Sequence, residues 1–107
     1  AYTINEPVAD GTSAAIAARG LTRQVTIGTI DGGCAGVRAV RDGKYAATVM
    51  QFPVRMADRG VAAVTAFAKD GRKPSGFTDT GTELITDKPV RALPSHTTDW
   101  GLRHCWG

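Results

Sequence analysis

The sequence of 107 residues has few of the residues that build metal centres and disulfide-rich scaffolds. Its two cysteines and two histidines exclude a four-cysteine zinc site and a disulfide-rich miniprotein. It contains no HExxH or CxxC motif, and its glycines lack the spacing of a GxGxxG or Walker phosphate loop. The GxSxG elbow of serine hydrolases is also missing. These absences disfavour a metal enzyme, a phosphate-binding loop and a serine-hydrolase nucleophile.

Long apolar runs and a strong charge of one sign are absent as well. No stretch approaches the roughly 18 apolar residues that indicate a membrane span, and no signal-peptide pattern is visible at the N-terminus. The net charge is only +3, from 13 basic and 10 acidic residues, and the basic residues are scattered. We therefore expect no nucleic-acid partner. The composition, 42% hydrophobic and 21% charged, is typical of one small globular domain.

Strand-like and helix-like segments alternate along the chain. Short segments rich in strand-forming residues predict strands at 1–4, 24–30, 45–50 and 81–86. Helix-forming segments predict helices at 8–19, 34–41 and 54–70. Asn5 is the expected N-cap of the first helix, Pro7 suits its first turn, and Gly20 ends it. The last helix carries an apolar stripe at helical spacing, and the chain from Asp87 onward is expected to be irregular. This alternation predicts an α/β fold, a Rossmann-like parallel sheet with crossover helices.

Three polar residues, Asn5, Asp31 and Gln51, follow the first three expected strands. Ligands of open α/β sheets bind beyond the carboxyl ends of the strands, so neighbouring strands would bring these side chains together. Asn and Gln both donate and accept hydrogen bonds, whereas Asp only accepts them. The set suits a neutral polyhydroxylated ligand better than an anion, which Asp31 would repel. A structural interpretation stays open, in which Asn5 and Asp31 only cap the helices that follow them.

The two cysteines, Cys34 and Cys105, allow two interpretations. A bridge between them would pin the end of the sequence to the body of the fold and would imply an oxidising compartment. The alternative is two unrelated free thiols. A reactive thiol is disfavoured at Cys34, because no His or Lys lies beside it in the sequence.

The remaining candidates for chemistry lie near the end of the sequence. His96 and His104, with Asp99 close by, are expected to be surface residues rather than catalytic ones. Trp100 and Trp106 are expected to pack within this region, with stacking on a sugar as the alternative. No catalytic residue is therefore assigned.

Three blocks of sequence point to a known family. They read NEPVADG at residues 5–11, IDGG at 30–33 and DGKYAATVMQFP at 42–53. In this order and spacing they resemble the C-terminal part of bacterial periplasmic sugar-binding proteins of the ribose-binding type, the solute receptors of ABC importers. The ending Cys105-Trp106-Gly107, with Cys34 after the Asp-Gly-Gly turn, is similar to the branch that includes fructose-binding proteins. The resemblance covers nearly the whole chain.

The resemblance implies a fold and a set of site residues. It implies the two-lobed periplasmic binding protein type 1 fold, with a sugar held between the lobes. Residues 1–51 would belong to the second lobe, 52–80 to the first, and 81–107 would return to the second with a disulfide-pinned end. Hinge crossings would then lie near Phe52, Pro53 and Gly81. The residues that fall on sugar-binding positions of the family are Asn5, Asp31 and Gln51.

The resemblance also implies a function, which is delivery of a monosaccharide to an ABC permease in the membrane. It therefore implies a binding protein that is not an enzyme and that uses no metal and no cofactor. The ligand would be a hexose or a pentose, with fructose as one candidate, and the compartment would be the periplasm. Most of the family's chain, including its sugar-stacking aromatic residues, has no counterpart in this sequence. The chain is therefore expected to be a fragment that carries part of the site and binds sugar weakly. Its exposed apolar helix 54–70 would favour a homodimer.

Two other interpretations compete with a transport receptor. One is the sugar-sensing domain of a lactose-repressor-type transcription regulator, which shares the fold. It would be cytosolic and would have no use for a structural disulfide, so the cysteine pair favours transport. The other is a small α/β enzyme or receiver domain, which would need an acidic cluster at the first strand ends. Asn5 and Asp31 do not form such a cluster.

Overall fold

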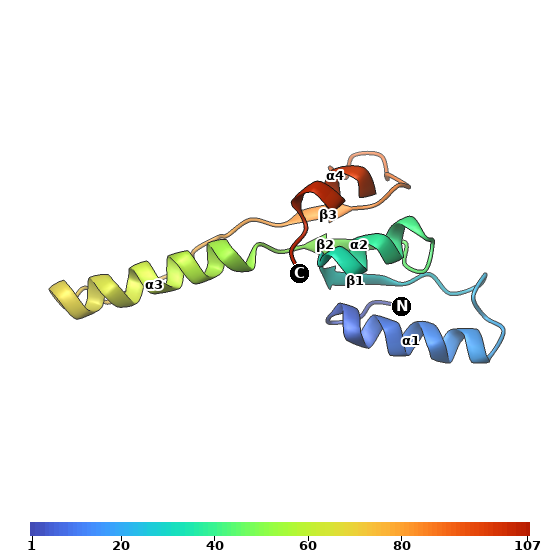
Figure 1. The fold of residues 1–107 in the computed structure, drawn as a ribbon, viewed down its shortest axis with the longest axis horizontal. Coiled ribbons are helices and arrows are strands. Elements are labelled where there is room, and N and C mark those ends of the chain that lie inside the picture. The colour runs from blue at the N-terminus through green and yellow to red at the C-terminus, as the bar shows by residue number, and fades with distance from the viewer. The chain divides into compact units, whose positions relative to one another are not determined.

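The computed structural model describes all 107 residues, which form two compact units. Residues 1–51 and 82–107 make the first unit, and residues 52–81 make the second. The first unit combines a three-stranded sheet with three helices, α1, α2 and α4 (Figure 1). All three candidate ligand-binding residues lie in this unit.

The sheet consists of β1 (Gly28–Asp31), β2 (Ala47–Met50) and β3 (Glu83–Ile85), in that order. β1 and β2 are parallel, as predicted, and pair Asp31 with Met50 at their carboxyl ends. β3 is antiparallel to β2 and places Glu83 opposite Met50. It runs antiparallel because the chain leaves the sheet after β2 and re-enters at the same edge. The predicted α/β fold with a parallel sheet is confirmed, with this antiparallel strand added.

All the strands are shorter than predicted, and the difference is largest for the first two. The amides of Gln24 and Val25 donate to the carbonyl of Leu21, so the chain after α1 turns before β1 begins. At the N-terminus, only Tyr2 pairs with the sheet, through a parallel bridge to Gly28. This bridge still places the start of the chain beside β1, on the side opposite β2.

The first two helices of the unit follow the sequence closely. α1 spans Glu6–Ala18, and the Asn5 side chain caps it by accepting from the amide of Val8 at 2.9 Å. α2 spans Cys34–Arg41, as predicted. α2 begins shortly after β1 ends, and the amide of Glu6, the first residue of α1, donates to the carboxylate of Asp31, the last residue of β1, so both helices start at the carboxyl edge of the sheet.

The prediction of an irregular chain after Asp87 is wrong, because α4 spans Thr98–His104. The Thr97 hydroxyl caps this helix by accepting from the amide of Trp100 at 3.4 Å. The Asp87 carboxylate fixes its first residue by accepting from the amide and the hydroxyl of Thr98 at 2.8 and 2.7 Å. Gly101 then lets α4 approach the core, where a Cβ atom would lie 2.9 Å from the Val37 side chain.

The core of the first unit lies around the two central strands. Its fully buried side chains come from β1, β2, β3 and α2, and they are Thr29, Thr48, Met50, Ile85 and Val37. A second buried cluster joins α1 to the start of β2 and consists of Ala9, Ile27, Val40 and Tyr45. The ends of β1 and β2 are therefore held by packing from both helices, which gives the loops that follow them a rigid base.

The second unit consists of α3 (Pro53–Asp70) and residues 71–81. Gly71 ends the helix in the left-handed conformation, with φ 66°. The guanidinium group of Arg55 lies 4.0 Å from the ring centroid of Phe52 and donates to the carbonyl of Thr80 at 3.5 Å. These contacts tie the start of α3 to the returning chain.

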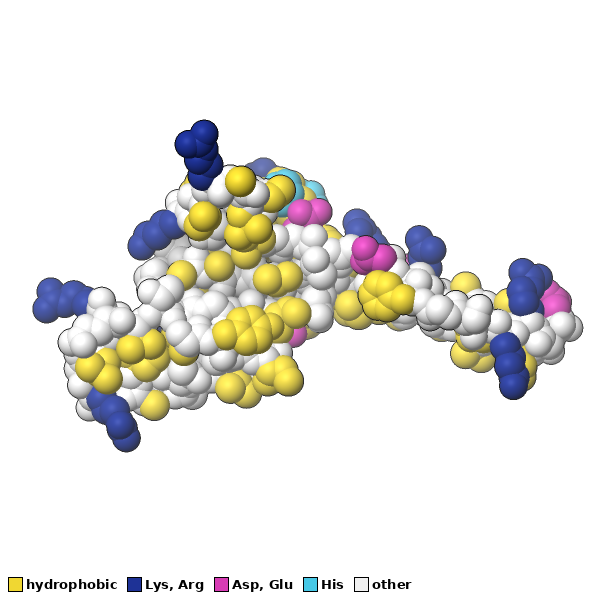
Figure 2. Space-filling view, turned by 180° about the vertical axis from the view of Figure 1, so that it is seen from behind, with side chains coloured by type: hydrophobic (Ala, Val, Ile, Leu, Met, Phe, Trp, Pro, Cys, Tyr) yellow, Lys and Arg dark blue, Asp and Glu magenta, His cyan; other side chains and the backbone are white.

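No residue of α3 is buried. Val54, Val61 and Val64 are each 67–69% exposed, and Figure 2 shows hydrophobic side chains, in yellow, on the surface that this helix forms. A helix with this pattern normally buries its apolar side against another element. None of the helices of the chain is long and apolar enough to span a lipid bilayer.

Candidate ligand-binding site

The three predicted site residues lie at two neighbouring strand ends and at the adjacent start of α1. Asp31 is the last residue of β1, and Gln51 follows the last residue of the adjacent β2. The amide of Gln51 donates to the carbonyl of Asp31 at 2.9 Å. Asn5 precedes Glu6, whose amide donates to the Asp31 carboxylate at 3.3 Å. The fold therefore brings Asn5, Asp31 and Gln51 to the same edge of the sheet, with Asp31 in the middle.

Each of these residues keeps polar atoms that no other group of the chain uses. The side-chain oxygen of Asn5 accepts the hydrogen bond that caps α1, which leaves its Nδ2 group to donate. The backbone amide of Glu6 occupies Oδ2 of Asp31, so that Oδ1 is left to accept. The Gln51 side chain, which is half-buried, makes no hydrogen bond within the chain. The Nδ2 donor of Asn5, the donor–acceptor amide of Gln51 and one carboxylate oxygen of Asp31 thus remain for a ligand with hydroxyl groups.

Asp31 has an unusual backbone, with a positive φ of 137°. Conformations of this kind cost a residue other than glycine about 1–3 kcal/mol and persist where the surroundings hold them. Its carbonyl accepts two hydrogen bonds, from the Gln51 amide and from Nε1 of Trp106 at 3.3 Å. The next residue must be a glycine, because Gly32 has φ 70° and a Cβ atom there would lie 2.3 Å from the Cα atom of Met50. The position of the Asp31 carboxylate therefore depends on these neighbours.

Glu6 is a residue that the sequence reasoning missed. Its Oε1 atom accepts from the Gly32 amide at 3.0 Å and from the Thr48 hydroxyl at 2.9 Å. A Cβ atom at Gly36 would lie 1.8 Å from the same oxygen, so only a glycine fits there. Glu6 thereby links the first turn of α1 to β2 and to the loop after β1. The only signal in the sequence was its place after Asn5, which by itself indicates a helix start.

Partial burial raises the pKa of Glu6 above its ordinary value of 4.5. The negative charge of Asp31 raises it further, whereas the hydrogen bonds from Thr48 and Gly32 act in the opposite direction. One turn later, the pKa of Asp10 is lowered by hydrogen bonds from Lys44 and Tyr45. These two carboxylates of α1 therefore respond to pH with opposite sign.

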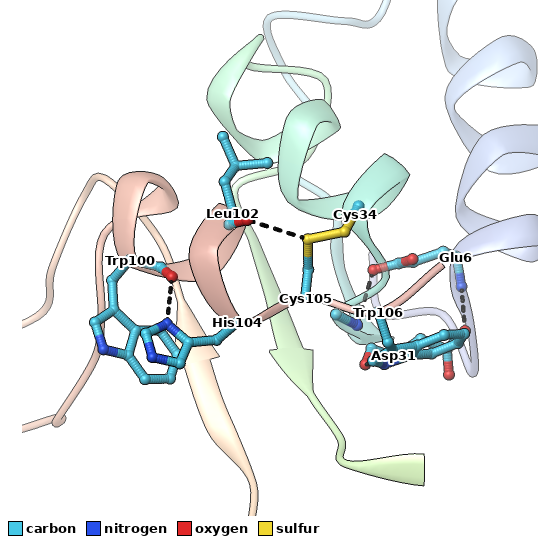
Figure 3. Close-up of a disulfide and its surroundings, with 9 residues drawn as sticks. Glu6, Asp31, Cys34, Trp100, Leu102, His104, Cys105 and Trp106 are labelled. Atoms are coloured by element: carbon cyan, nitrogen blue, oxygen red, sulfur yellow. Dashed lines mark hydrogen bonds between the residues drawn. A yellow bond between two sulfur atoms is a disulfide. The ribbon is translucent and has the colours of Figure 1, made fainter. Parts of the chain in front are cut away.

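A disulfide holds the end of the chain beside the site. Cys34, the first residue of α2, is bonded to Cys105, as the first of the two sequence interpretations proposed. The Cys34 amide also donates to the carbonyl of Trp106 at 3.0 Å. Figure 3 shows the bridge, with Trp106 lying beside Asp31 and Glu6. Residues 105–107, here called the tail segment, therefore lie against the loop that carries Asp31.

Trp100 does not face this site. His96 and His104 both stack on its indole, each with ring centroids 3.9 Å apart. Nε2 of His96 lies 3.2 Å from the Glu83 carboxylate, and Nδ1 of His104 lies 2.8 Å from the Trp100 carbonyl. These contacts support the expected packing role of Trp100 and leave no nucleophile beside either histidine.

No protein-family model matches the sequence, and no curated protein matches it. Solved structures do match. A solute-binding protein of an ABC transporter from Agrobacterium vitis, with bound D-fucose, is 28% identical with a TM-score of 0.66; the match covers 85% of this chain and 31% of that one. A galactofuranose-binding protein is 32% identical with a TM-score of 0.65, over 78% of this chain and 28% of that one. A carbohydrate transporter solute-binding protein from Agrobacterium radiobacter, in complex with D-arabinose, is 30% identical with a TM-score of 0.65, over 80% and 29%.

These similar proteins are transport or binding proteins for sugars, and none is an enzyme. This chain spans less than a third of the length of each. The resemblance predicted from the sequence is therefore confirmed: over most of its length, this chain has the fold of a sugar-binding protein of the ABC-importer type.

Proposed function

We propose that this chain forms one side of a monosaccharide-binding site in a receptor that delivers the sugar to an ABC importer. Asn5 would donate to the sugar hydroxyls, Gln51 would donate to them and accept from them, and Asp31 would accept from them. The ligand class is a neutral hexose or pentose, with fructose among the candidates because of the ending Cys105-Trp106-Gly107. Each of the solved relatives is described with, or named for, a sugar of five or six carbons.

One observation carries this proposal: Asn5 at the start of α1, Asp31 at the end of β1 and Gln51 just after β2 all keep unused polar atoms. In a buried structural network these groups would form hydrogen bonds with each other, because an unpaired polar group inside a fold is destabilising. Here they lie half-buried at an open edge of the sheet, where a sugar can pair with them. A pair of amides beside one carboxylate also favours a neutral ligand over an anion.

We infer that the two compact units correspond to parts of two lobes. In this assignment residues 1–51 and 81–107 belong to one lobe and residues 52–80 to the other, with hinges at Phe52, Pro53 and Gly81. Support comes from the change of compact unit after Gln51 and again after Gly81. Closure of such lobes around a ligand is a hinge-type switch, and the closed form is the form that a membrane permease would recognise.

The periplasm is the proposed location. A disulfide that spans most of the chain persists in an oxidising compartment and is rare in the cytosol. The same bond argues against a cytosolic sugar-sensing regulator. The membrane partner would be the permease of the importer.

We further propose that these 107 residues carry only part of the sugar site. The solved relatives are more than three times as long as the part that matches this chain. Polar contacts made in open water contribute little net free energy, so the 107-residue chain alone should bind sugar weakly.

The exposed Val61 and Val64 of α3 would favour a homodimer. Sedimentation at rising concentration tests the dimer; a monomer at every concentration would contradict it.

The direct test is calorimetric titration with a panel of hexoses and pentoses. The protein used is this chain extended by the coding sequence upstream of Ala1. Tight binding of one sugar by the wild type, and its loss in Asp31→Ala, would support the proposal. The matched control is Asp42→Ala, which removes an exposed carboxylate at the far end of α2. Equal loss in both variants, or binding unaffected by Asp31→Ala, would refute the assignment.

A further inference from the structure

We propose that the tail segment, residues 105–107, is a positioning element of the sugar site. In this proposal Trp106 holds the Asp31 carbonyl in place, and the Cys34–Cys105 disulfide holds Trp106. The inference rests on the proposed function, because it assigns to the disulfide an effect on sugar affinity. It goes beyond that function by making affinity depend on the redox state of a bond outside the ligand contacts.

The backbone conformation of Asp31 depends on the contacts around it. Its positive φ of 137° is unfavourable for a residue with a side chain, so the conformation has to be held by contacts. Its carboxylate accepts from the Glu6 amide, and its carbonyl accepts from the Gln51 amide and from Nε1 of Trp106. The first two donors belong to the backbone of the central fold. Trp106 is the only side chain that donates to Asp31.

Trp106 is held in place by its backbone contacts and by the neighbouring disulfide. Its backbone carbonyl accepts from the Cys34 amide at 3.0 Å, and it forms a parallel bridge with Gly33. The preceding residue, Cys105, is covalently bonded to the first residue of α2. Trp106 itself remains 40% exposed, so burial alone does not fix it. The tail segment thus depends on one covalent bond and a few hydrogen bonds (Figure 3).

The disulfide and the Asp31 loop are therefore coupled through Trp106. When the disulfide is reduced by dithiothreitol, the reductant supplies two electrons and two protons, becomes a cyclic disulfide, and leaves Cys34 and Cys105 as thiols. The tail segment can then leave the loop, and the Asp31 carbonyl loses its indole donor. Asp31 is then free to relax toward a more favourable φ, which moves its carboxylate away from the position that a sugar requires.

The experiment compares Trp106→Phe with Trp100→Phe. Both variants remove one indole N–H and keep an aromatic ring, but only Trp106 contacts Asp31, while Trp100 stacks on two histidines. In the extended protein, Trp106→Phe should raise the Kd for the bound sugar roughly five- to tenfold, the usual effect of one hydrogen bond. Trp100→Phe should change it less than about twofold. Reduction should weaken binding in the wild type at least as much as Trp106→Phe does.

A second readout needs no sugar. In the 107-residue chain, hydrogen exchange at the amides of Gln51 and Gly32 should become faster in Trp106→Phe and on reduction, and stay unchanged in Trp100→Phe. If the wild type binds no sugar, the proposed function fails, and this exchange measurement alone decides whether Trp106 positions the loop. Equal affinities in both variants of a sugar-binding protein, or unchanged exchange at Gln51, would overturn the inference.

Discussion

Glu6 and the Asp31 loop are joined reciprocally. The Glu6 amide donates to the Asp31 carboxylate at 3.3 Å, and the Glu6 carboxylate accepts from the amide of Gly32, the next residue, at 3.0 Å. The same carboxylate reaches Thr48 on β2. The start of α1, the loop after β1 and the neighbouring strand therefore form one hydrogen-bonded unit. The candidate site is built on this unit, so changes at Glu6 should be measurable both in stability and at the site.

The raised pKa of Glu6 predicts a pH effect with a definite sign. Because the folded protein favours the protonated form, the stabilisation from this group is complete below pH 4.5 and is lost as pH rises through the folded-state pKa. Glu6→Gln keeps an acceptor oxygen but cannot ionise. Relative to the wild type, this variant should therefore become more stable as the pH rises from 4 to 7.

Urea unfolding at a series of pH values checks this prediction. Asp10 must be left intact, because its lowered pKa makes its own contribution present at neutral pH and lost as pH falls. Asp58→Asn, on the exposed surface of α3, serves as the charge-matched control. If the difference between Glu6→Gln and the wild type does not vary with pH, the burial of Glu6 has been misjudged.

A second prediction concerns Gly36, which lies against the Glu6 carboxylate. Gly36→Ala places a Cβ atom 1.8 Å from the Glu6 carboxylate oxygen, which two hydrogen bonds hold in place. The overlap should cost about 1–3 kcal/mol of stability. Gly11→Ala, in the open interior of α1, meets no atom within 4 Å and should instead stabilise by about 0.5–1 kcal/mol. Denaturant midpoints measure both, and a neutral Gly36→Ala would contradict the described packing.

Much of the first unit could be predicted from local sequence signals. The Asn5 cap, the start of α2 after the Asp-Gly-Gly turn and the polar strand ends all follow from residue type and order. Glu6 could not be identified in this way, because its role depends on Gly32 and Thr48, which lie 26 and 42 positions away. A side chain that pairs only through the tertiary fold leaves no local pattern.

The missed helix α4 has a different explanation. Its seven residues are too few for a helical periodicity, and they include Gly101, a weak helix former. The helix is stabilised by the Thr97 cap and by the Asp87 carboxylate, eleven positions before Thr98. Short helices of this kind depend on tertiary contacts more than on propensity. The same holds for β1, which begins four positions later than its β-branched sequence suggests.

A third prediction separates the capping role of Asn5 from its proposed ligand role. Ser is as good an N-cap as Asn, but it lacks the Nδ2 donor. Asn5→Ser should therefore keep the stability of the wild type while weakening sugar binding by roughly tenfold. Asn5→Ala should lose about 1 kcal/mol of stability as well. Thermal unfolding and calorimetry, run on the same samples, check the two effects; unchanged affinity in Asn5→Ser would leave Asn5 as a cap alone.

The fourth prediction concerns the disulfide. The bonded cysteines are 71 positions apart, and closing a loop of that size contributes about 4 kcal/mol in the chain-entropy model. Cys34→Ser/Cys105→Ser should therefore lower the free energy of unfolding by about that amount. Urea titration of this variant beside the oxidised wild type measures the loss. A loss below about 1 kcal/mol would mean that the rest of the fold holds the tail segment without the bond.

The most direct test of the account is the titration of a monosaccharide panel into the chain extended upstream of Ala1. We predict that one hexose or pentose binds tightly, that Asp31→Ala abolishes this binding, and that the protein stays folded. Absence of binding across the whole panel, in a protein shown to be folded and oxidised, would contradict the assignment of Asn5, Asp31 and Gln51 as sugar contacts.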